Sequence, residues 1–404
     1  MDTPANLSTP TLILRKNEDR RLRAGHNWVF SNEVDIQRTP LTAIPTGSAV
    51  CVLDWQERFI GHAYANPHAL VCARLISRNA DYPLSKSLIV HRLNIALSLR
   101  QRLFPQPYYR MCYGDSDGLP GLVVDRYGEY LVVQITAAGM ESHKDDIIAA
   151  LCQICEVKGI LLRNDSSMRE LEGLPLYVET VFGEVPEQTR IYEGDAAFQV
   201  PLLQGQKTGW FFDHRLNRQR MTHYVKEKSV LDLFSYLGAW GIQAAKAGAS
   251  EVLCIDASAT ACEIAEENAR INSVADRVSI LKQDVFDGLR ELRSQSRRFD
   301  VVIADPPAFI QRRKDMKKGS EAYRRLNQQA MQVLSKDGIL ISASCSMHLE
   351  TNTLRDILLK ASRHLDRYLV ITEQGHQGPD HPIHPAMQEM EYLKTLFCRV
   401  LPSQ

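Results

Sequence analysis

The stretch SVLDLFSYLGAWG, residues 229–241, decides the fold of the C-terminal half of this chain. Its apolar first half is typical of a buried strand, and its glycines open a turn into a helix. The same pattern of strand and then helix recurs in EVLCIDAS (251–258), VSILKQD (278–284), FDVVIADPP (299–307) and GILISASCS (338–346). Strands that alternate with helices at this period build an open parallel sheet with helices on both faces. We therefore predict an α/β domain over residues 191–404.

Two further domains are expected upstream of this sheet. From about residue 11 to residue 78, short alternating segments separated by Pro, Gly and Asn predict a small β-rich domain, to which we assign residues 1–80. Apolar residues at helical spacing over 88–103, followed by further strand and helix patterns, predict a middle α+β domain over residues 81–190. The polar segment FGEVPEQTRIYEG (182–194) is interpreted as the link to the α/β domain.

The composition limits the classes of partner. Among 404 residues, 48 Lys and Arg balance 48 Asp and Glu, so an anionic partner must be bound by local patches rather than by the overall charge. No apolar stretch reaches the length of a membrane span, and the N-terminus lacks a basic start followed by an apolar core. We therefore expect a cytoplasmic protein with no membrane partner. The nine cysteines, an odd number without regular spacing, predict free thiols in a reducing compartment.

Two short motifs resemble parts of metal sites. Cys152 and Cys155 form a CxxC pair, but no second pair follows at zinc-finger spacing, so we favour buried helix positions for both. His381 and His384, in HPIHP, provide too few ligands for a metal ion. We expect no metal.

The predicted strand ends carry polar side chains. Ligands of such sheets bind beyond the carboxyl ends of the strands, near the point where strand order reverses. The second to fifth strands end at Asp256, Asp284, Asp305 and Cys345. The spacing from Gly238 to Asp256 fits a carboxylate that accepts hydrogen bonds from a ribose diol, although a nicotinamide enzyme would use the same corner and a strand-end aspartate is often a helix N-cap. The motif DPPAF (305–309) favours a rigid turn that holds an acid and a ring against a planar base.

In this order, DLFSYLGAWG, CIDAS, QDVF, DPPAF and SCS resemble the motifs of class I S-adenosylmethionine-dependent methyltransferases, whose sheet is Rossmann-like. Upstream, the segments 22–34, 115–128 and 205–218 (LRAGHNWVFSNEV, DSDGLPGLVVDRYG and GQKTGWFFDHRLNR) resemble the ribosomal RNA large subunit methyltransferase I family, over nearly the whole chain. The resemblance implies an N-terminal PUA domain and an enzyme that forms 5-methylcytosine in 23S ribosomal RNA. It also implies S-adenosyl-L-methionine as the cofactor and large-subunit ribosomal RNA as the partner. We expect a homodimer.

Cys345 has a chemical role in such a reaction. Cytosine C5 becomes nucleophilic only after a nucleophile adds to C6, and a thiolate is suited to that addition because it also leaves readily. Asp305 would hydrogen-bond the cytosine edge, and Phe309 would stack on the base. The structural alternative for Cys345 is a small buried core residue, the commonest place for a free cysteine.

Two positions depart from related patterns. Other RNA cytosine-C5 methyltransferases have a second cysteine in the fourth-strand motif, where this chain has Ala308. DPPAF also approaches the motif of amino-methylating enzymes, which keeps an N-methyltransferase as an alternative in which Cys345 is structural. The family more often has Gln where this chain has His214.

A non-catalytic RNA-binding protein with a degenerate methyltransferase fold is the alternative from another functional class.

The resemblance also implies binding residues. The cofactor set is Lys207, Thr208, Gly209, Phe212, Asp213, Arg215, Phe234, Gly238, Asp256, Ser258, Asp284 and Asp305. The resemblance implies that QKTGWFFDHR (206–215) forms a lid over the cofactor. The alternative for DHRLNRQR (213–220) is a solvated basic helix, to which Arg218 and Arg220 in particular would belong. For RNA, we expect contacts from Phe309, from the charge run at Arg312, Arg313, Lys317 and Lys318, and from Arg15, Arg20, Arg21, Arg23 and Trp28 in the N-terminal domain.

Overall fold

The structure is a computed structural model that describes residues 9–403, so the first eight residues of the N-terminal stretch considered above lie outside it. The chain forms two compact units. The first contains residues 9–188 together with 201–210 and 379–390, and the second contains 189–200, 211–378 and 391–403. The predicted division into three domains stays a prediction.

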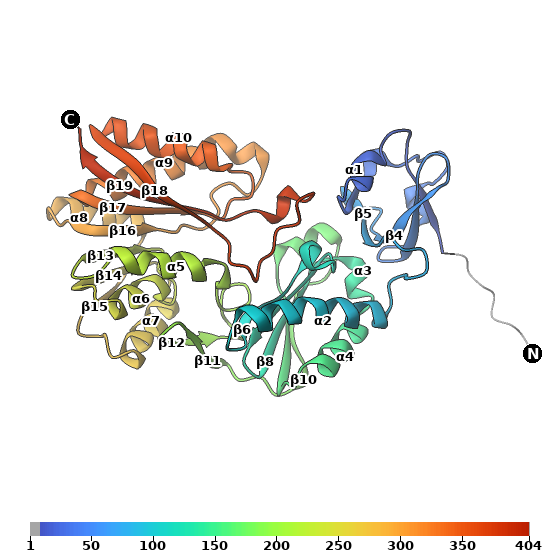
Figure 1. Ribbon diagram of the computed structural model, residues 1–404, viewed down its shortest axis with the longest axis horizontal. Helices are drawn as coiled ribbons and strands as arrows, with labels where there is room; N and C mark the ends of the chain where they lie inside the picture. The colour runs from blue at the N-terminus through green and yellow to red at the C-terminus, as the bar shows by residue number, and fades with distance from the viewer. Residues whose placement is uncertain (1–8, 404) are drawn as a thin grey trace, which may run out of the picture. The chain divides into compact units, whose positions relative to one another are not determined.

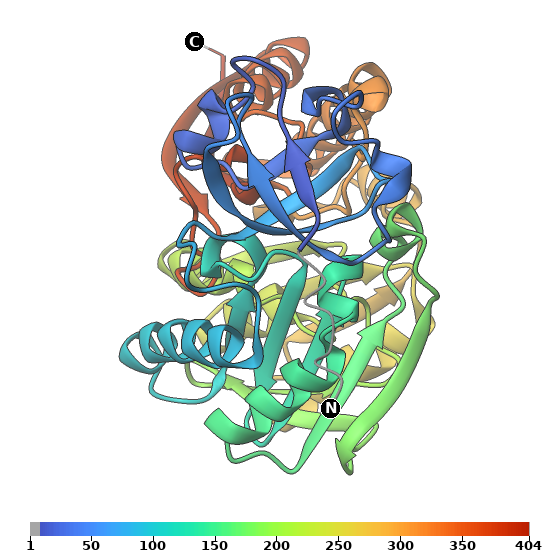
Figure 2. The ribbon, with the colours of Figure 1, turned by 90° about the vertical axis from the view of Figure 1, so that its right-hand side faces the viewer.

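The N-terminal part of the first unit is a five-stranded sheet, drawn in blue in Figure 2. Its strands follow the spatial order β1-β3-β4-β5-β2, and α1 (Arg20–Arg23) lies between the first two strands in sequence. Alternating apolar side chains such as Val50 and Val52 fill its core, as the period-2 pattern predicts. The strand bounds are β1 (Thr11–Ile13), β2 (Trp28–Phe30), β3 (Ala49–Leu53), β4 (Phe59–Ala65) and β5 (Val71–Ser77).

The middle of the chain adds a second five-stranded sheet, with strand order β10-β9-β8-β7-β6. The helices α2 and α4 pack against it through apolar residues that include Ile89 and Leu151 (Figure 1). The predicted helix and strands in this region are confirmed. The bounds are α2 (Lys86–Leu103), β6 (Tyr108–Tyr113), β7 (Leu122–Tyr127), β8 (Tyr130–Ile135), α3 (Ala138–Glu141), α4 (Lys144–Ile154), β9 (Gly159–Asn164) and β10 (Tyr177–Gly183).

The polar segment that we interpreted as a link is more ordered than expected. Strand β11 (Gln188–Glu193) occupies its second half and pairs with β12 (Ala196–Pro201) in a two-stranded sheet. Ile191 and Glu193 of β11 are buried, whereas Tyr192 between them is exposed. The division between the two units falls within this segment, but strand β11 was not predicted, because alternation over so few residues is hidden by the polar side chains around it.

The second unit is built on a seven-stranded sheet with the order β15-β14-β13-β16-β17-β19-β18. Its first five strands pair in parallel, as predicted, but β19 is antiparallel to both β17 and β18. No α-helix crosses over between β18 and β19, so the returning chain runs in the opposite direction. The bounds are β13 (Ser229–Leu233), β14 (Glu251–Asp256), β15 (Val278–Lys282), β16 (Phe299–Ala304), β17 (Leu334–Ser344), β18 (Arg367–His376) and β19 (Lys394–Pro402).

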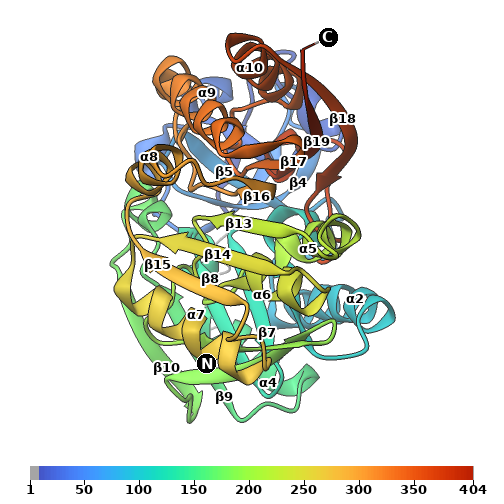
Figure 3. The ribbon, with the colours of Figure 1, turned by 90° about the vertical axis from the view of Figure 1, so that its left-hand side faces the viewer.

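Helices cover both faces of this sheet. Figure 3 shows α8, α9 and α10 on one face and α5, α6 and α7 on the other. Glycine permits one close approach: a Cβ on Gly241 in α6 would lie 2.4 Å from Sγ of Cys254 in β14. The helices are α5 (Arg215–Met221), α6 (Ala239–Lys246), α7 (Ala259–Ile271), α8 (Val285–Ser294), α9 (Met316–Gln332) and α10 (Thr351–His364).

Candidate active site at the carboxyl edge of the sheet

The strand order of the second unit reverses between β13 and β16. From β13 the chain proceeds outward through β14 and β15, and then returns to the other side of β13 with β16. Asp256 is the last residue of β14, Asp305 follows β16 directly, and Cys345 follows β17 directly. The polar residues that we expected at the strand ends therefore share the edge where ligands of such sheets bind.

The turn after β13 has an unusual backbone. Phe234 and Tyr236 have φ angles of 61° and 49°, and Gly238 follows with a φ of 77° at the N-cap of α6. Asp256 supports this turn, since its Oδ2 accepts a hydrogen bond from the Tyr236 backbone N–H at 2.9 Å. Its Oδ1 accepts from the backbone N–H of Ser258 at 2.9 Å. The turn and the carboxylate thus form one connected element at the strand ends.

The helix-capping alternative applies to two cofactor candidates. Ser258 is the N-cap of α7, and its side chain accepts from the backbone N–H of Ala261. Asp284 is the N-cap of α8, and its carboxylate accepts from the N–H groups of Phe286 and Asp287. Each side chain therefore has a structural partner, while Asp284 remains exposed to solvent at the site edge.

Asp305 is held by two buried side chains. Trp240 Nε1 donates to its Oδ2 at 3.1 Å, and His214 Nε2 lies 3.1 Å from its Oδ1. The His214 and Trp240 rings meet edge to face, with 5.2 Å between centroids. Burial lowers the pKa of His214, but the Asp305 charge and hydrogen bond outweigh it, so the pKa is raised. Sequence reasoning missed Trp240, which reads only as an apolar residue of a Gly-rich turn.

Cys345 is half-buried, with Sγ 4.0 Å from the carbonyl oxygen of Pro306. The serines on either side of it are fully buried and bind Tyr323 of α9. Ser344 Oγ donates to the Tyr323 hydroxyl at 2.8 Å, and that hydroxyl lies 2.9 Å from Ser346 Oγ. The SCS motif is therefore a strand end whose flanking residues point inward and whose cysteine is the accessible member.

Lys394, at the start of β19, is a second residue that sequence reasoning missed. It stands opposite Ser344 in the antiparallel pair β17/β19. Its Nζ donates to the carbonyl oxygens of Ser346 and Tyr392, at 2.8 Å each. Burial lowers its pKa to about 8, while the charge interaction with Cys345 acts in the opposite direction. The only sequence signal is a lysine at the start of a largely apolar strand, KTLFCRVLP (394–402).

Asp232, within β13, is a buried acid beneath the site. Its Oδ2 accepts from the backbone N–H of Gly241 at 3.0 Å. Burial is the main reason that its pKa rises to about 8, with added repulsion from Asp305 and Asp256. At neutral pH this side chain is mostly protonated.

The DPPAF turn is packed against α9. Phe309 is half-buried, with ring centroids 4.8 Å from Tyr323 and 6.4 Å from Phe234. A Cβ on Gly319 would lie only 2.6 Å from the Phe309 carbonyl oxygen, so the start of α9 lies directly on the turn. The basic residues predicted to contact RNA are all exposed in this region: Arg312, Arg313, Lys317 and Lys318.

The loop proposed as a cofactor lid is divided between the two units. Lys207, Thr208 and Gly209 belong to the first unit, where the Thr208 hydroxyl donates to Asp125 at 2.6 Å. Phe212, Asp213 and Arg215 belong to the second unit. Asp213 accepts a hydrogen bond from the Tyr392 hydroxyl at 2.5 Å, and the Arg215 guanidinium lies 5.3 Å from the Phe212 ring.

One interpretation of this region was wrong. Arg218 is buried rather than solvated, and it forms a bidentate ion pair with Glu193 at 2.6 and 2.7 Å. Burial raises the pKa of Glu193, but the charge and hydrogen bonds of Arg218 outweigh burial. The pKa of Glu193 is therefore lowered. The partner lies 25 residues upstream, so local spacing gave no sign of the pair.

Several N-terminal residues expected to contact RNA are engaged within the first unit. Arg21 pairs with Glu33, and Arg23 pairs with Asp19 and Asp54. Trp28 Nε1 donates to Asp115 Oδ1 at 3.0 Å. In contrast, Arg20 is exposed, and its guanidinium donates to the Asn17 side-chain oxygen at 3.4 Å.

Residues 9–403 contain neither a metal-binding cluster nor a membrane-spanning helix. No three or more His, Cys, Asp or Glu side chains of this part of the chain are grouped as they would be around a metal ion. None of its helices combines the length and apolar character that crossing a membrane requires. All nine cysteines are free thiols, as predicted.

The edge residues fit S-adenosylmethionine. The Asp256 carboxylate stands at the end of β14, where a ribose diol can donate to it, and Gly238 leaves the backbone of the adjacent turn open to a ligand. The half-buried rings of Phe234 and Phe309 provide apolar surface beside them. This donor set suits a nucleoside with a positively charged tail, since the strand ends carry acidic groups.

Comparisons with known proteins agree with this geometry. A family model described as S-adenosylmethionine-dependent methyltransferase matches residues 175–397, and a PUA-like domain model matches residues 12–78. The ribosomal RNA large subunit methyltransferase I of Vibrio cholerae is 34% identical over 401 residues, covering 97% of this chain and 100% of the relative. That of Aliivibrio fischeri is 35% identical over 398 residues, with the same coverage.

Solved structures show the same fold. A crystal structure of a protein assigned as a methyltransferase and complexed with SAH aligns with a TM-score of 0.84 at 21% identity, over 97% of this chain and 100% of that chain. A structure from Streptococcus mutans, assigned to the SAM-dependent methyltransferases, aligns with a TM-score of 0.82 at 20% identity over the same shares. The predicted fold and cofactor are confirmed. The chain belongs to the ribosomal RNA large subunit methyltransferase I family, whose S-adenosyl-L-methionine-dependent domain follows an N-terminal PUA-like domain.

Proposed function

We propose that this chain methylates C5 of a cytosine in large-subunit ribosomal RNA. The relatives named as ribosomal RNA large subunit methyltransferases support the RNA substrate. The observation that carries the C5 chemistry is the position of Cys345, an accessible thiol at the end of β17, beside the DPPAF turn. A methyl transfer to an exocyclic nitrogen has no use for a nucleophile there.

Cys345 acts first in this proposal. Its thiolate adds to C6 of the cytosine, which breaks the C5–C6 double bond and makes C5 nucleophilic. Bound S-adenosylmethionine supplies an electrophilic methyl group, which C5 accepts. A base, either water or Asp305, then takes the C5 proton, which restores the C5–C6 double bond and expels the Cys345 thiolate. In the second unit, the residues that would hold the cofactor are Phe212, Asp213, Arg215, Phe234, Gly238, Asp256, Ser258, Asp284 and Asp305. The expected cofactor contacts of Lys207, Thr208 and Gly209, in the first unit, stay predictions.

The surroundings of Cys345 support the addition step. The Lys394 ammonium interacts electrostatically with Cys345, so it favours the thiolate over the neutral thiol. Tyr323 binds the serines on both sides, which fixes the backbone that carries the thiol. Lys394 and Tyr323 are thus positioning residues rather than catalytic ones.

Asp305 is proposed to bind the cytosine edge. Its carboxylate has one oxygen toward Trp240 and one toward His214, and each carboxylate oxygen can accept more than one hydrogen bond. A fixed carboxylate beside the base stabilises the charge that develops when C6 is attacked. Phe309, on the same turn, provides the stacking surface.

An N-methyltransferase is the second candidate. It is favoured by the DPPAF sequence, which places an acid and a ring next to each other as amino-methylating enzymes do. A non-catalytic RNA-binding protein is the third, and failure to bind the cofactor in calorimetry would favour it.

A homodimer and a cytoplasmic location stay predictions; sedimentation equilibrium tests the first and cell fractionation the second.

The deciding experiment uses RNA that carries 5-fluorocytidine. Fluorine cannot leave C5 as a proton does, so the methylated adduct stays bound to Cys345 and survives denaturing electrophoresis. We expect the adduct with the wild-type chain and its absence with Cys345→Ala, which should still bind S-adenosylmethionine. Cys152→Ala, which changes a half-buried thiol in α4, is the matched control. Methylation by Cys345→Ala at the normal rate would exclude the C5 mechanism and favour N-methylation.

A further inference from the structure

The first unit contains a cavity of about 320 Å³ that has no part in the methyl transfer proposed above. One wall comes from the N-terminal sheet, with residues from β5 and the loop before β2. The other wall comes from α2, the 3-10 turn Gly114–Asp117 and the segment 379–390. The two walls are joined by buried contacts such as Asn66 Nδ2 to Glu172 Oε2 at 2.8 Å. The cavity is lined by Asn27, Leu75, Ile76, Ser77, Arg78, Arg92, Asp115, Ser116, Gly118 and His384.

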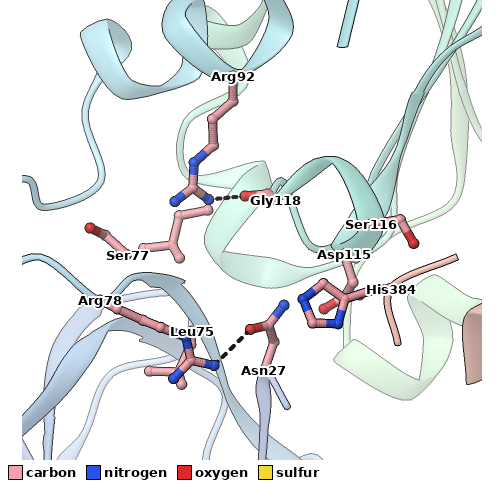
Figure 4. A pocket seen from close by; sticks show the side chains of 10 residues that line it. Asn27, Leu75, Ser77, Arg78, Arg92, Asp115, Ser116, Gly118 and His384 are labelled. Carbon is pink, nitrogen blue, oxygen red and sulfur yellow. Dashed lines mark hydrogen bonds between the residues drawn. The ribbon is translucent and has the colours of Figure 1, made fainter. Parts of the chain in front are cut away.

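Two guanidinium groups face this cavity from opposite sides (Figure 4). Arg92 reaches in from α2, and its guanidinium bonds to the Gly118 carbonyl oxygen. Arg78 comes from the end of β5 and donates to the carbonyl oxygens of Leu22 and His26, at 2.8 and 2.9 Å. A third bond, 3.2 Å long, joins Arg78 to the Asn27 side chain. Both arginines are therefore oriented by backbone carbonyls before any ligand arrives.

Neither arginine has a carboxylate partner within residues 9–403, and other arginines of this unit do. Arg74 pairs with Glu172, Arg100 with Asp117 and Arg110 with Asp125. Burial without a counter-charge lowers the pKa of both Arg78 and Arg92. Removing cations from water without an anion is unfavourable, so such a pair is expected where an external anion completes the site.

The rest of the lining favours a phosphate over a base. The cavity has one ring, the His384 imidazole, and otherwise aliphatic or polar side chains, so it lacks a platform on which a base could stack. A guanidinium fork matches the geometry of phosphate oxygens. Asp115 is the one carboxylate of the lining, and one of its oxygens is bound by Trp28. Burial raises the pKa of Asp115 to about 6, so it stays mostly charged at pH 7, but the two guanidinium groups leave the lining with a net positive charge.

We propose that Arg78 and Arg92 bind one backbone phosphate of the RNA substrate in this cavity. The site anchors the strand on the PUA-like and middle parts of the chain, within the first unit. It is a phosphodiester subsite, so it contributes to affinity without reading sequence. The proposal rests on the proposed RNA substrate.

The test measures binding of deproteinised large-subunit ribosomal RNA over a range of salt concentrations. Arg78→Gln and Arg92→Gln should each bind about tenfold more weakly, because a charge-assisted contact to phosphate is lost. The slope of log affinity against log salt should fall by about 0.7 to 0.9, the value of one phosphate contact. The double variant should lose little more than either single variant, since both residues hold the same phosphate. Arg102→Gln, an exposed arginine on the same helix as Arg92, is the matched control and should change neither quantity.

A second pair of variants guards against misfolding. Arg78→Lys and Arg92→Lys keep the charge but lose the fork, so they should keep the salt slope and bind less tightly. Unchanged affinity and slope in both Gln variants would overturn the proposal. A second result would also overturn the proposal: inorganic phosphate raises the Tm of the wild-type chain but not of the double variant, while RNA binding is unaffected. The site would then bind a free anion rather than an RNA phosphate. Failure of the proposed function would appear differently, as a wild-type chain that does not bind this RNA at all.

Discussion

The imidazole Nε2 of His214 lies 3.1 Å from Oδ1 of Asp305, and both side chains are largely buried at the strand edge. The other ring nitrogen, Nδ1, lies 3.3 Å from the Asn217 amide nitrogen, so in the neutral ring the proton sits on Nε2 and points at Asp305. The contact joins the lid segment to the residue proposed to bind the base. In chains that carry Gln at this position, a neutral amide would take the place of the His214 imidazole.

The pair should make stability depend on pH. The raised pKa of His214 means that the charged pair stabilises the fold fully below the unfolded value of 6.5 and is lost as pH rises through the folded value. We expect the free-energy difference between the wild-type chain and His214→Gln to be larger at pH 6 than at pH 9. Urea unfolding at both pH values measures it. An equal difference at both would show that His214 acts there only as a neutral hydrogen-bond donor.

Asp232, although it is an acid, should also make stability fall as pH rises. Its folded pKa of about 8 exceeds the ordinary value of 3.8, so the folded chain holds a proton that the unfolded chain loses between these pH values. Stability is therefore fully present below pH 3.8 and declines as pH rises toward 8, by at most about 1.4 kcal/mol per pH unit. Asp232→Asn should remove this decline, as measured by unfolding at pH 5 and pH 8. A variant that keeps the wild-type slope would assign the decline to other groups.

Lys394 should control the reactivity of Cys345. Lys394→Met removes the ammonium, so the thiolate population falls and alkylation by iodoacetamide at pH 7 should become about tenfold slower. Because the pKa of Lys394 is about 8, the difference between the two proteins should shrink above that pH. Mass spectrometry of the Cys345 peptide measures the rate, and the half-buried Cys51 serves as an internal reference. Equal rates at pH 7 would remove Lys394 from the mechanism.

Asp256 should contribute to cofactor affinity. Asp256→Ala removes the proposed acceptor for the ribose hydroxyls, and such charge-assisted bonds contribute about 1.5 to 3 kcal/mol. Calorimetry should show a dissociation constant for S-adenosylmethionine raised by about ten- to a hundredfold. Because the carboxylate also accepts from the Tyr236 and Ser258 backbone, Asp256→Asn is the control that retains an acceptor for the turn. Unchanged affinity in both variants would place the ribose elsewhere.

The exposed basic run before and within α9 should contribute to RNA affinity through its charge. Replacing Arg312, Arg313, Lys317 and Lys318 by Ala should weaken binding and reduce the salt slope by about 3, if each residue neutralises one phosphate. The control is the double variant Lys226→Ala and Lys228→Ala. These exposed lysines precede β13, at the end of that strand opposite to the candidate active site. A slope that stays at the wild-type value would make the run a solvated helix face.

Much of the fold could be predicted from the sequence because its information is local. The strand and helix patterns from residue 229 to Cys345 give the five parallel strands, and the residue after each strand necessarily lies at one edge of the sheet. Asp256, Asp305 and Cys345 could therefore be assigned to a common edge without coordinates. The antiparallel β19 and the short β11 could not, since strand direction and pairing depend on distant partners.

What the tertiary structure decided is the set of partners around those edge residues. Trp240, His214 and Asp305 are separated by up to 91 positions in the chain, and Lys394 is 49 positions beyond Cys345, so no local pattern connects them. The same holds for Arg218 with Glu193, where burial turned an expected solvated residue into an ion pair. Sequence determines which residues are strand ends, because periodicity and turns are encoded locally. Hydrogen bonds, burial and shifted pKa values arise only when folding brings distant residues together, and these were therefore decided by the tertiary structure.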